Sequence, residues 1–102
     1  MSITNIDVDQ STRQILVSGR YIPVGSRAFD ILVLLMGAGG KVVSIADILR
    51  QVWPDTVVEE SNIRVHVCAL RKALGDDERR MIQTIPGRGY RLTPSHLSDD
   101  LF

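Results

Sequence analysis

The sequence predicts an α+β domain in which three helices lie between a small antiparallel sheet and a C-terminal β-hairpin. Three observations support this fold class. Short β-branched runs separated by a glycine turn come first, stretches with apolar residues at helical spacing follow, and two short apolar runs around residues 86–90 come last. The 102 residues are enough for one domain, which is expected to bury about two thirds of the surface of the unfolded chain.

The N-terminal sheet is predicted from residues 2–24. Residues 2–8 alternate weakly between apolar and polar side chains, and residues 14–17 and 20–24 are rich in β-branched residues. Ser18-Gly19 separates the latter two runs, and such a two-residue connection is typical of a β-hairpin. We therefore expect short antiparallel strands in this part of the chain.

Two helices are expected next. The first follows residues 25–26, because apolar residues recur there at helical spacing, and the glycine-rich stretch 37–40 ends it. Ser44 is suited to be the N-cap of the second helix, because its hydroxyl can accept a hydrogen bond from an amide of the first turn. This helix should end at Trp53, since the residue before a proline disfavours helical backbone, and a loop at 54–58 follows.

The third predicted helix has one apolar face and one face that is expected to be exposed. Ile63, Val67, Leu70 and Leu74 recur at helical spacing and share one face, which is expected to be buried. The opposite face carries Ser61, Val65, Cys68, Ala69 and Lys72. A glycine at position 75 is a typical C-cap, residues 76–80 form a polar connector, and 81–85 and 90–93 are predicted strands.

The distribution of charge favours a nucleic-acid partner. The formal net charge of the chain is zero, which by itself weighs against phosphate binding. Residues 62–93, however, hold seven basic side chains against three acidic ones. The positive charge is therefore concentrated on the third helix and the hairpin.

An enzyme or a metal site is not expected. One cysteine, Cys68, and two histidines, His66 and His96, cannot form a four-ligand zinc site without distant carboxylates. Residues 37–41 are similar to half of a phosphate-binding loop, but they follow a predicted helix instead of a strand. No nucleophile stands in a pattern that supplies it with a base, and no cofactor is expected.

The sequence also predicts a cytoplasmic protein with no membrane contact in this chain. The longest apolar stretch, which begins at Ile31, is too short to span a bilayer, and the N-terminus lacks the pattern of a signal peptide. A single cysteine excludes an intramolecular disulfide and favours a reducing compartment.

Five motifs together resemble one known family, the OmpR/PhoB-type winged-helix DNA-binding domains of bacterial transcription regulators. The motifs are Val42-Val43-Ser44, Val52-Trp53, Val65-His66-Val67, Leu70-Arg71-Lys72-Ala73-Leu74 and residues 84–90, in the order and spacing of the family. The resemblance extends from Ile3 to Thr93. It implies a winged helix-turn-helix domain at 1–93, followed by a disordered tail at 94–102.

The resemblance implies sequence-specific binding to double-stranded DNA. The recognition helix, about residues 59–74, would lie in the major groove, and the wing, residues 81–93, in the neighbouring minor groove. Two copies would bind direct-repeat half-sites as a homodimer on DNA, and the 54–60 loop would contact RNA polymerase. The chain departs from many relatives at Cys68 and Ala69, where an Arg pair is common, and at Pro86, where a basic residue often stands.

Carried over position by position, the resemblance assigns three kinds of DNA contact. Bases would be faced by Asn62, Val65, His66 and Ala69, with Ser61 on the same outward face. Phosphates would lie near Trp53, Arg64, Arg71, Lys72 and Thr84, and Arg88 would enter the minor groove. Simpler interpretations are that Arg71 and Lys72 complement the helix dipole and that His66 is a half-buried histidine.

Two questions stay open at this point. A winged helix could instead dock a protein partner through the exposed Val65 and Ala69, without binding DNA, and its binding would then respond little to salt. Relatives usually carry a sensing or phosphorylation module in the same chain, as in two-component systems, so this chain is either an excised domain or a stand-alone regulator. The form of residues 24–29 is similar to relatives whose winged helix is N-terminal to a separate module.

Overall fold

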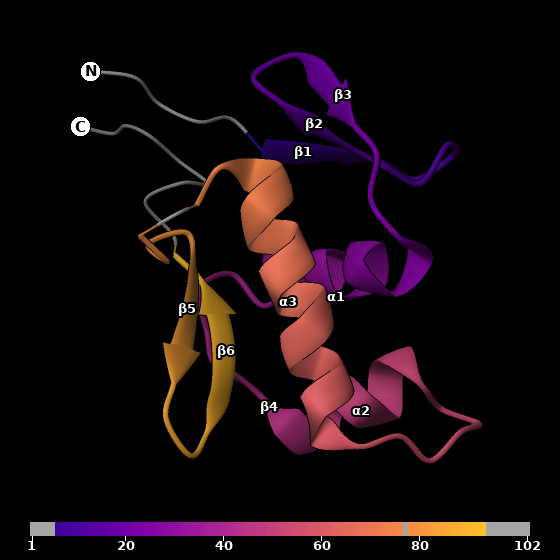
Figure 1. Ribbon diagram of the computed structural model, residues 1–102, viewed down its shortest axis with the longest axis vertical. Coiled ribbons are helices and arrows are strands. Elements are labelled where there is room, and N and C mark those ends of the chain that lie inside the picture. The colour runs from indigo at the N-terminus through magenta and orange to yellow at the C-terminus, as the bar shows by residue number, and fades with distance from the viewer. Residues whose placement is uncertain (1–5, 77, 94–102) are drawn as a thin grey trace.

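Two three-stranded antiparallel sheets flank three helices in the computed structural model, which describes residues 6–76 and 78–93. Helix α3 crosses the face seen in Figure 1, with the β5–β6 hairpin beside it and the first sheet at its C-terminal end. The elements are β1 (Ile6–Asp9), β2 (Gln14–Val17), β3 (Arg20–Ile22), α1 (Ser26–Gly37), β4 (Val43–Ser44), α2 (Ile45–Val52), α3 (Glu60–Leu74), β5 (Ile82–Ile85) and β6 (Gly89–Leu92). The predicted α+β winged helix-turn-helix is confirmed.

The predicted N-terminal antiparallel sheet is present, with the strand order β1-β2-β3. Val17 pairs with Arg20 across the turn, where Ser18 and Gly19 adopt φ values of 52° and 84°. Such left-handed backbone at two successive residues is what a tight hairpin turn requires. Ile15 points into the core from the central strand and is fully buried.

Helices α1 and α2 begin and end close to their predicted positions. The most deeply buried side chains of α1 include Phe29, Leu32 and Leu35. The Ser44 hydroxyl accepts a hydrogen bond from the Asp47 amide at 3.0 Å, which confirms the predicted N-cap of α2. Trp53 is the C-cap, directly before Pro54.

Helix α3 presents one face to the core and the other to solvent. Ile63, Val67 and Leu70 are fully buried, and Leu74 nearly so. The helix ends at Gly75, whose φ of 71° allows its amide to bond back to the last turn. The apolar residues of α3 belong to the same core cluster as those of α1, so α3 is held rigidly against the domain.

Strand β4 was not predicted, and it is what joins the C-terminal hairpin to the helices. Val43 pairs with Tyr90 and Ser44 with Gly89, so the second sheet has the order β4-β6-β5. A Cβ atom at Gly89 would lie 2.0 Å from the Val43 carbonyl oxygen, so only glycine allows this close approach. The hairpin is therefore fixed next to the start of α2.

The predicted polar connector between α3 and β5 contains a buried carboxylate. Asp76 is 5% exposed and accepts hydrogen bonds from the amides of Arg80, Met81 and Ile82, at 2.8 to 3.1 Å. These bonds set the direction in which the chain enters β5. The predicted tail at 94–102 lies outside the described residues, and among the described residues no helix has the length and apolar character needed to span a membrane.

Candidate nucleic-acid interface

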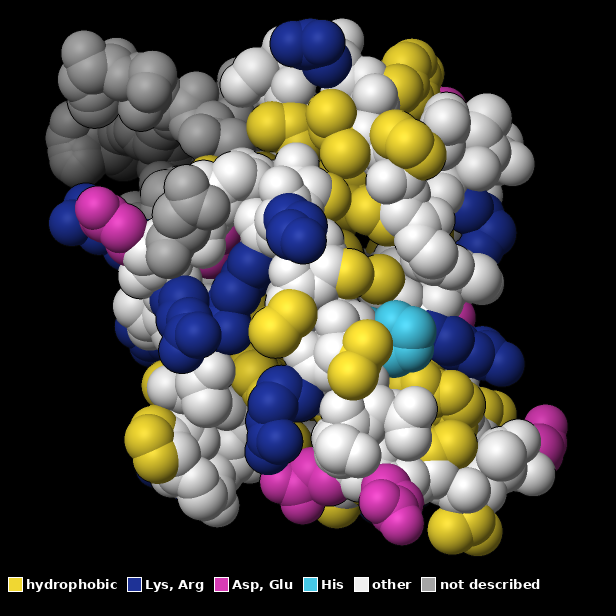
Figure 2. All heavy atoms as spheres, in the orientation of Figure 1, with side chains coloured by type: hydrophobic (Ala, Val, Ile, Leu, Met, Phe, Trp, Pro, Cys, Tyr) yellow, Lys and Arg dark blue, Asp and Glu magenta, His cyan; other side chains and the backbone are white. Residues whose placement is uncertain are grey.

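The outward face of α3 is exposed as the sequence predicts. Val65 is 64% exposed, His66 is half-buried, and six other predicted residues are exposed as well: Ser61, Asn62, Arg64, Cys68, Ala69 and Lys72. Figure 2 shows hydrophobic side chains at the centre of this face, with Lys and Arg side chains beside and above them and acidic side chains below them. A small apolar strip bordered by cations is suited to contact base edges while the cations contact phosphates.

A groove separates α3 from the β5–β6 hairpin. Its volume is about 710 Å³, and its walls include Arg64 and Cys68 from the helix and Thr84 and Arg88 from the hairpin. Arg71 and Arg79 also line the groove, as does one acidic residue, Glu60. We call this cavity with its arginines the basic groove. Its positive charge is suited to hold an anionic chain between helix and hairpin.

Arg71 holds the hairpin to the helix. Its side chain is half-buried, and its Nε and Nη2 donate to the Ile82 carbonyl at 3.1 and 2.7 Å. Nη2 also donates to Thr84 Oγ1 at 2.9 Å. The sequence predicted Arg71 and Thr84 as phosphate contacts, and the structure adds an internal role for both, because their bonds fix the distance between α3 and β5.

Arg88 lies at the tip of the hairpin. Its amide donates to the Ile85 carbonyl at 2.9 Å, and Gly87 with φ of 74° completes the turn. The residue is exposed, so its side chain extends from a backbone that is itself well fixed. This geometry is suited to insert one cation into a narrow groove.

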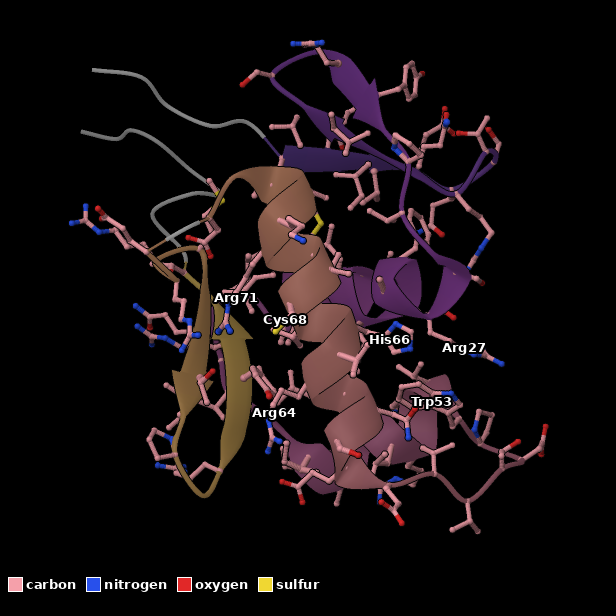
Figure 3. The ribbon with its side chains drawn as sticks, viewed as in Figure 1. Arg27, Trp53, Arg64, His66, Cys68 and Arg71 are labelled. Carbon is pink, nitrogen blue, oxygen red and sulfur yellow. The ribbon has the colours of Figure 1, made fainter. Side chains whose placement is uncertain are left out.

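Trp53 and His66 meet on the side of α3 away from the hairpin, as Figure 3 shows. Their ring centroids are 5.7 Å apart and the planes are tilted by 38°. Both residues are half-buried. His66 is therefore positioned by the C-terminal end of α2, in agreement with the simpler interpretation of this residue, and its predicted contact with bases stays a prediction.

Sequence reasoning did not assign Arg79, which lines the basic groove. It stands in the connector with φ of 57°, an uncommon backbone conformation for a residue with a side chain. Its basic character was visible in the sequence, but the turn that brings it back towards α3 was not. Among the described residues, no cluster of His, Cys, Asp and Glu side chains is arranged to hold a metal ion.

Comparison with protein families and curated proteins finds bacterial regulators. The chain matches the family described as "Transcriptional regulatory protein, C terminal" over residues 19–92. It is 38% identical to the transcriptional regulator HilA of Salmonella typhi over 78 residues, which is 76% of this chain and 14% of HilA. It is 36% identical to the phosphate regulon regulatory protein PhoB of Rhizobium meliloti over 90 residues, which is 86% of this chain and 40% of PhoB. The chain thus spans less than half the length of these relatives.

Solved structures with the same fold are DNA-binding domains. The DNA-binding domain of E. coli CadC superposes with a TM-score of 0.77 at 29% identity, covering 90% of this chain and 89% of that domain. The DNA-binding domain of the response regulator AdeR, solved in complex with an intercistronic region, gives a TM-score of 0.77 at 21% identity and covers 91% and 98% of the two chains. At that identity the AdeR likeness shows the fold alone.

Proposed function

Because this chain belongs to the OmpR/PhoB-type family of DNA-binding domains of bacterial transcription regulators, we propose that it reads duplex DNA with α3 in the major groove and the β5–β6 hairpin in the next minor groove. An α-helix with its side chains is about 10 to 12 Å wide, which matches a major groove of about 12 Å. The family is a class of transcription-factor domains and not of enzymes.

The single observation that carries the proposal is the basic groove. It places Arg64, Arg79 and Arg88 around the space that a phosphate strand would occupy between the two grooves of DNA. The DNA-binding domain of CadC, which is 29% identical to this chain, has the same fold. The same arrangement gives little reason for a module that docks only proteins, because the exposed apolar strip at Val65 is narrow and bordered by cations.

Base recognition then falls to the short side chains of the α3 face. Asn62 can make a bidentate contact with adenine, and its Nδ2 now donates to the Glu59 carbonyl at 3.3 Å, a bond that a base edge can replace. Val65 and Ala69 are suited to apolar contact with thymine methyl groups. Lys72, exposed in the last turn, supplies a phosphate contact together with Arg64.

Two copies on direct-repeat half-sites are the proposed functional unit. The net charge is zero and each copy has few cations on its DNA face, so one copy should bind weakly. Half-sites about one helical turn apart place the second copy on the same side of the duplex. Binding to the tandem site should be much tighter than to one half-site, and equal affinities for the two would contradict this unit.

The loop between α2 and α3 is the proposed contact with RNA polymerase. It joins the two helices at the edge of the DNA-reading face, and Val57 within it is 100% exposed. Because Val57 is fully exposed, it can be substituted without disturbing the core. Val57→Ser, which adds no charge, should leave DNA affinity unchanged and lower activated transcription in vitro.

The test of the main proposal is selection of genomic fragments by this chain, followed by titration at several salt concentrations. The account predicts enrichment of a shared sequence and a log–log salt slope of about −0.9 for each phosphate contact. The Arg64→Ala variant, with Arg20→Ala on β3 as the control, should flatten that slope. DNA binding that depends on neither salt nor sequence would contradict this function and favour a module that docks a protein partner.

A further inference from the structure

A helix in the major groove lies between two phosphate strands, one on each of its flanks. The flank of α3 that faces the hairpin is lined by the arginines of the basic groove. The other flank is formed by Trp53 and His66, and in Figure 3 the side chain of Arg27 extends on this same flank. None of the predicted contacts includes Arg27.

The packing of α1 on α2 brings Arg27 near the C-terminal end of α2. Arg27 is the second residue of α1. It lines a cavity of about 380 Å³ together with Val52 and Pro54, the residues on either side of Trp53. The Trp53 ring contacts the His66 ring, and all three side chains lie on the side of α3 away from the hairpin.

The charge of Arg27 is only loosely compensated. Its Nη1 lies 3.4 Å from Asp30 Oδ2, and its side chain is 50% exposed. Arg13 already pairs with Asp30 Oδ1 at 2.5 Å and stacks over the Phe29 ring at 4.7 Å. One carboxylate thus faces two guanidinium groups, and Arg13 makes the closer contact.

The start of α1 adds to the positive potential at this point. The first turn contains no acidic residue, and its N-cap is Gly25, which has no side chain to cap the helix. The positive end of the helix dipole is therefore not offset by an acidic side chain of its own first turn. The dipole and the guanidinium of Arg27 have the same sign.

We infer that Arg27 binds a backbone phosphate of duplex DNA, on the strand that borders the side of α3 opposite to the hairpin. This inference rests on the proposed function. Trp53 and His66 lie between Arg27 and the bases, so the Arg27 guanidinium extends the DNA footprint outwards by one phosphate. The domain then contacts phosphates on both strands that border the major groove.

The test measures affinity against salt for Arg27→Ala on a duplex from the genomic selection, about two helical turns long. Arg27→Ala should lose one phosphate contact and therefore depend less on salt. The ratio of its Kd to the wild-type Kd should fall about 3.5-fold as salt rises from about 50 to 200 mM. Arg27→Lys keeps the charge and should keep the wild-type slope. Arg20→Ala, an exposed arginine on β3, is the matched control and should behave as wild type.

Two further measurements separate this inference from the proposed function. Arg64→Ala is titrated alongside: if it flattens the slope and Arg27→Ala does not, the inference is overturned and the function stands. If the DNA affinity of the wild type does not depend on salt, and both variants bind like the wild type, the proposed function itself is contradicted. Circular dichroism melts confirm that the Arg27 variants fold, and a Lys variant as impaired as the Ala variant would also overturn the inference.

A scan with single neutral methylphosphonates locates the contact on the DNA. The wild type should lose affinity when the phosphate bound by Arg27 is neutralised, and Arg27→Ala should be insensitive at that one position. That position should lie on the strand away from the hairpin. Sensitivity of Arg27→Ala at every position where the wild type is sensitive would contradict the assignment.

Discussion

The two β-hairpins of this domain have similar turns and different attachments. The β2–β3 hairpin turns at Ser18-Gly19, and the β5–β6 hairpin turns at Gly87, each with glycine backbone in the left-handed region. Only the second is tied to α3 by an arginine, through Arg71 and Ile82, and only the second pairs with a strand that leads into a helix. A hairpin therefore becomes a rigid DNA-reading element through its attachments and not through its turn.

The first sheet is supported by local bonds and by Arg13, which bonds to Ser26 and Asp30 of α1. The Asp9 carboxylate accepts bonds from the Ser11 hydroxyl at 2.6 Å and from the Ser11 amide at 3.0 Å. The bond from the Ser11 hydroxyl is the main reason why the pKa of Asp9 lies below its usual value. Because these bonds join neighbouring residues, losing one should leave α3 undisturbed, in contrast to the bonds of the second hairpin.

The largest expected effect comes from removing the buried carboxylate that directs the chain into β5. Asp76→Ala leaves three amides without their acceptor and should lower the free energy of unfolding by about 3 to 4 kcal/mol. Urea unfolding measures it. Asp76→Asn retains an acceptor and should lose less, and Glu78→Ala, an exposed neighbour, should change stability by less than about 0.5 kcal/mol. Equal stability of the Ala variant and wild type would contradict the structural role.

A somewhat smaller loss is expected when the close approach of β4 and β6 is blocked. Gly89→Ala should cost about 2 to 3 kcal/mol, because its Cβ would overlap the Val43 carbonyl oxygen. Gly87→Ala is the matched control: no atom lies within 4 Å of its Cβ, and the backbone strain costs about 1 kcal/mol. Thermal melts of both variants compare them. Equal losses of stability in the two variants would mean that backbone strain, and not contact with β4, makes glycine necessary at position 89.

Substitutions of Arg71 and Lys72, at the end of α3, should distinguish an effect on stability from an effect on DNA binding alone. Arg71→Ala should lower stability by about 1 to 2 kcal/mol and weaken DNA binding, because it releases the hairpin from α3. Lys72→Ala should leave stability unchanged and reduce the salt slope by about 0.9. Paired urea and DNA titrations measure both. If Arg71→Ala reduced only the salt slope, Arg71 would be a phosphate contact and not a tie.

Periodicity and capping signals were enough to predict most of this fold. The buried face of α3, the Ser44 cap and the Gly75 cap follow from local side-chain chemistry, and all three are confirmed. Strand β4 was missed because two residues are too few to show an alternating pattern. The role of Asp76 was missed because an acidic residue in a connector is normally solvated, and its burial depends on three amides that come later in the chain.

The candidate site was predictable in its residue types and less so in its connections. The resemblance placed cations on α3 and at the hairpin tip, where the structure has them exposed or lining the basic groove. The Trp53–His66 contact and the Arg71 bonds join separate elements, so no local pattern in the sequence reports them. Arg27 likewise reaches the flank of α3 through the packing of α1 against α2 and α3, which no local pattern reports.

Substitution of Arg88 should have the smallest effect on stability and the most sequence-dependent effect on DNA binding. An exposed turn residue typically changes stability by less than about 0.5 kcal/mol. An arginine in the minor groove gains most from narrow A·T-rich segments. Arg88→Ala should therefore weaken binding more on sites with an A·T-rich flank than on those with a G·C-rich flank, as measured by titration of matched duplexes. Equal losses on both would make Arg88 a general phosphate contact.

The most direct test of the two-groove arrangement is a pair of footprints on one selected site, with wild type and Arg88→Ala compared at saturating protein. Hydroxyl radicals probe the minor groove, and methylation of guanine N7 probes the major groove. The account predicts that Arg88→Ala loses minor-groove protection in the flank while the guanines under α3 stay protected. Unchanged flank protection would remove the hairpin from the minor groove, and loss of both footprints in a folded variant would contradict the separate roles of α3 and the hairpin.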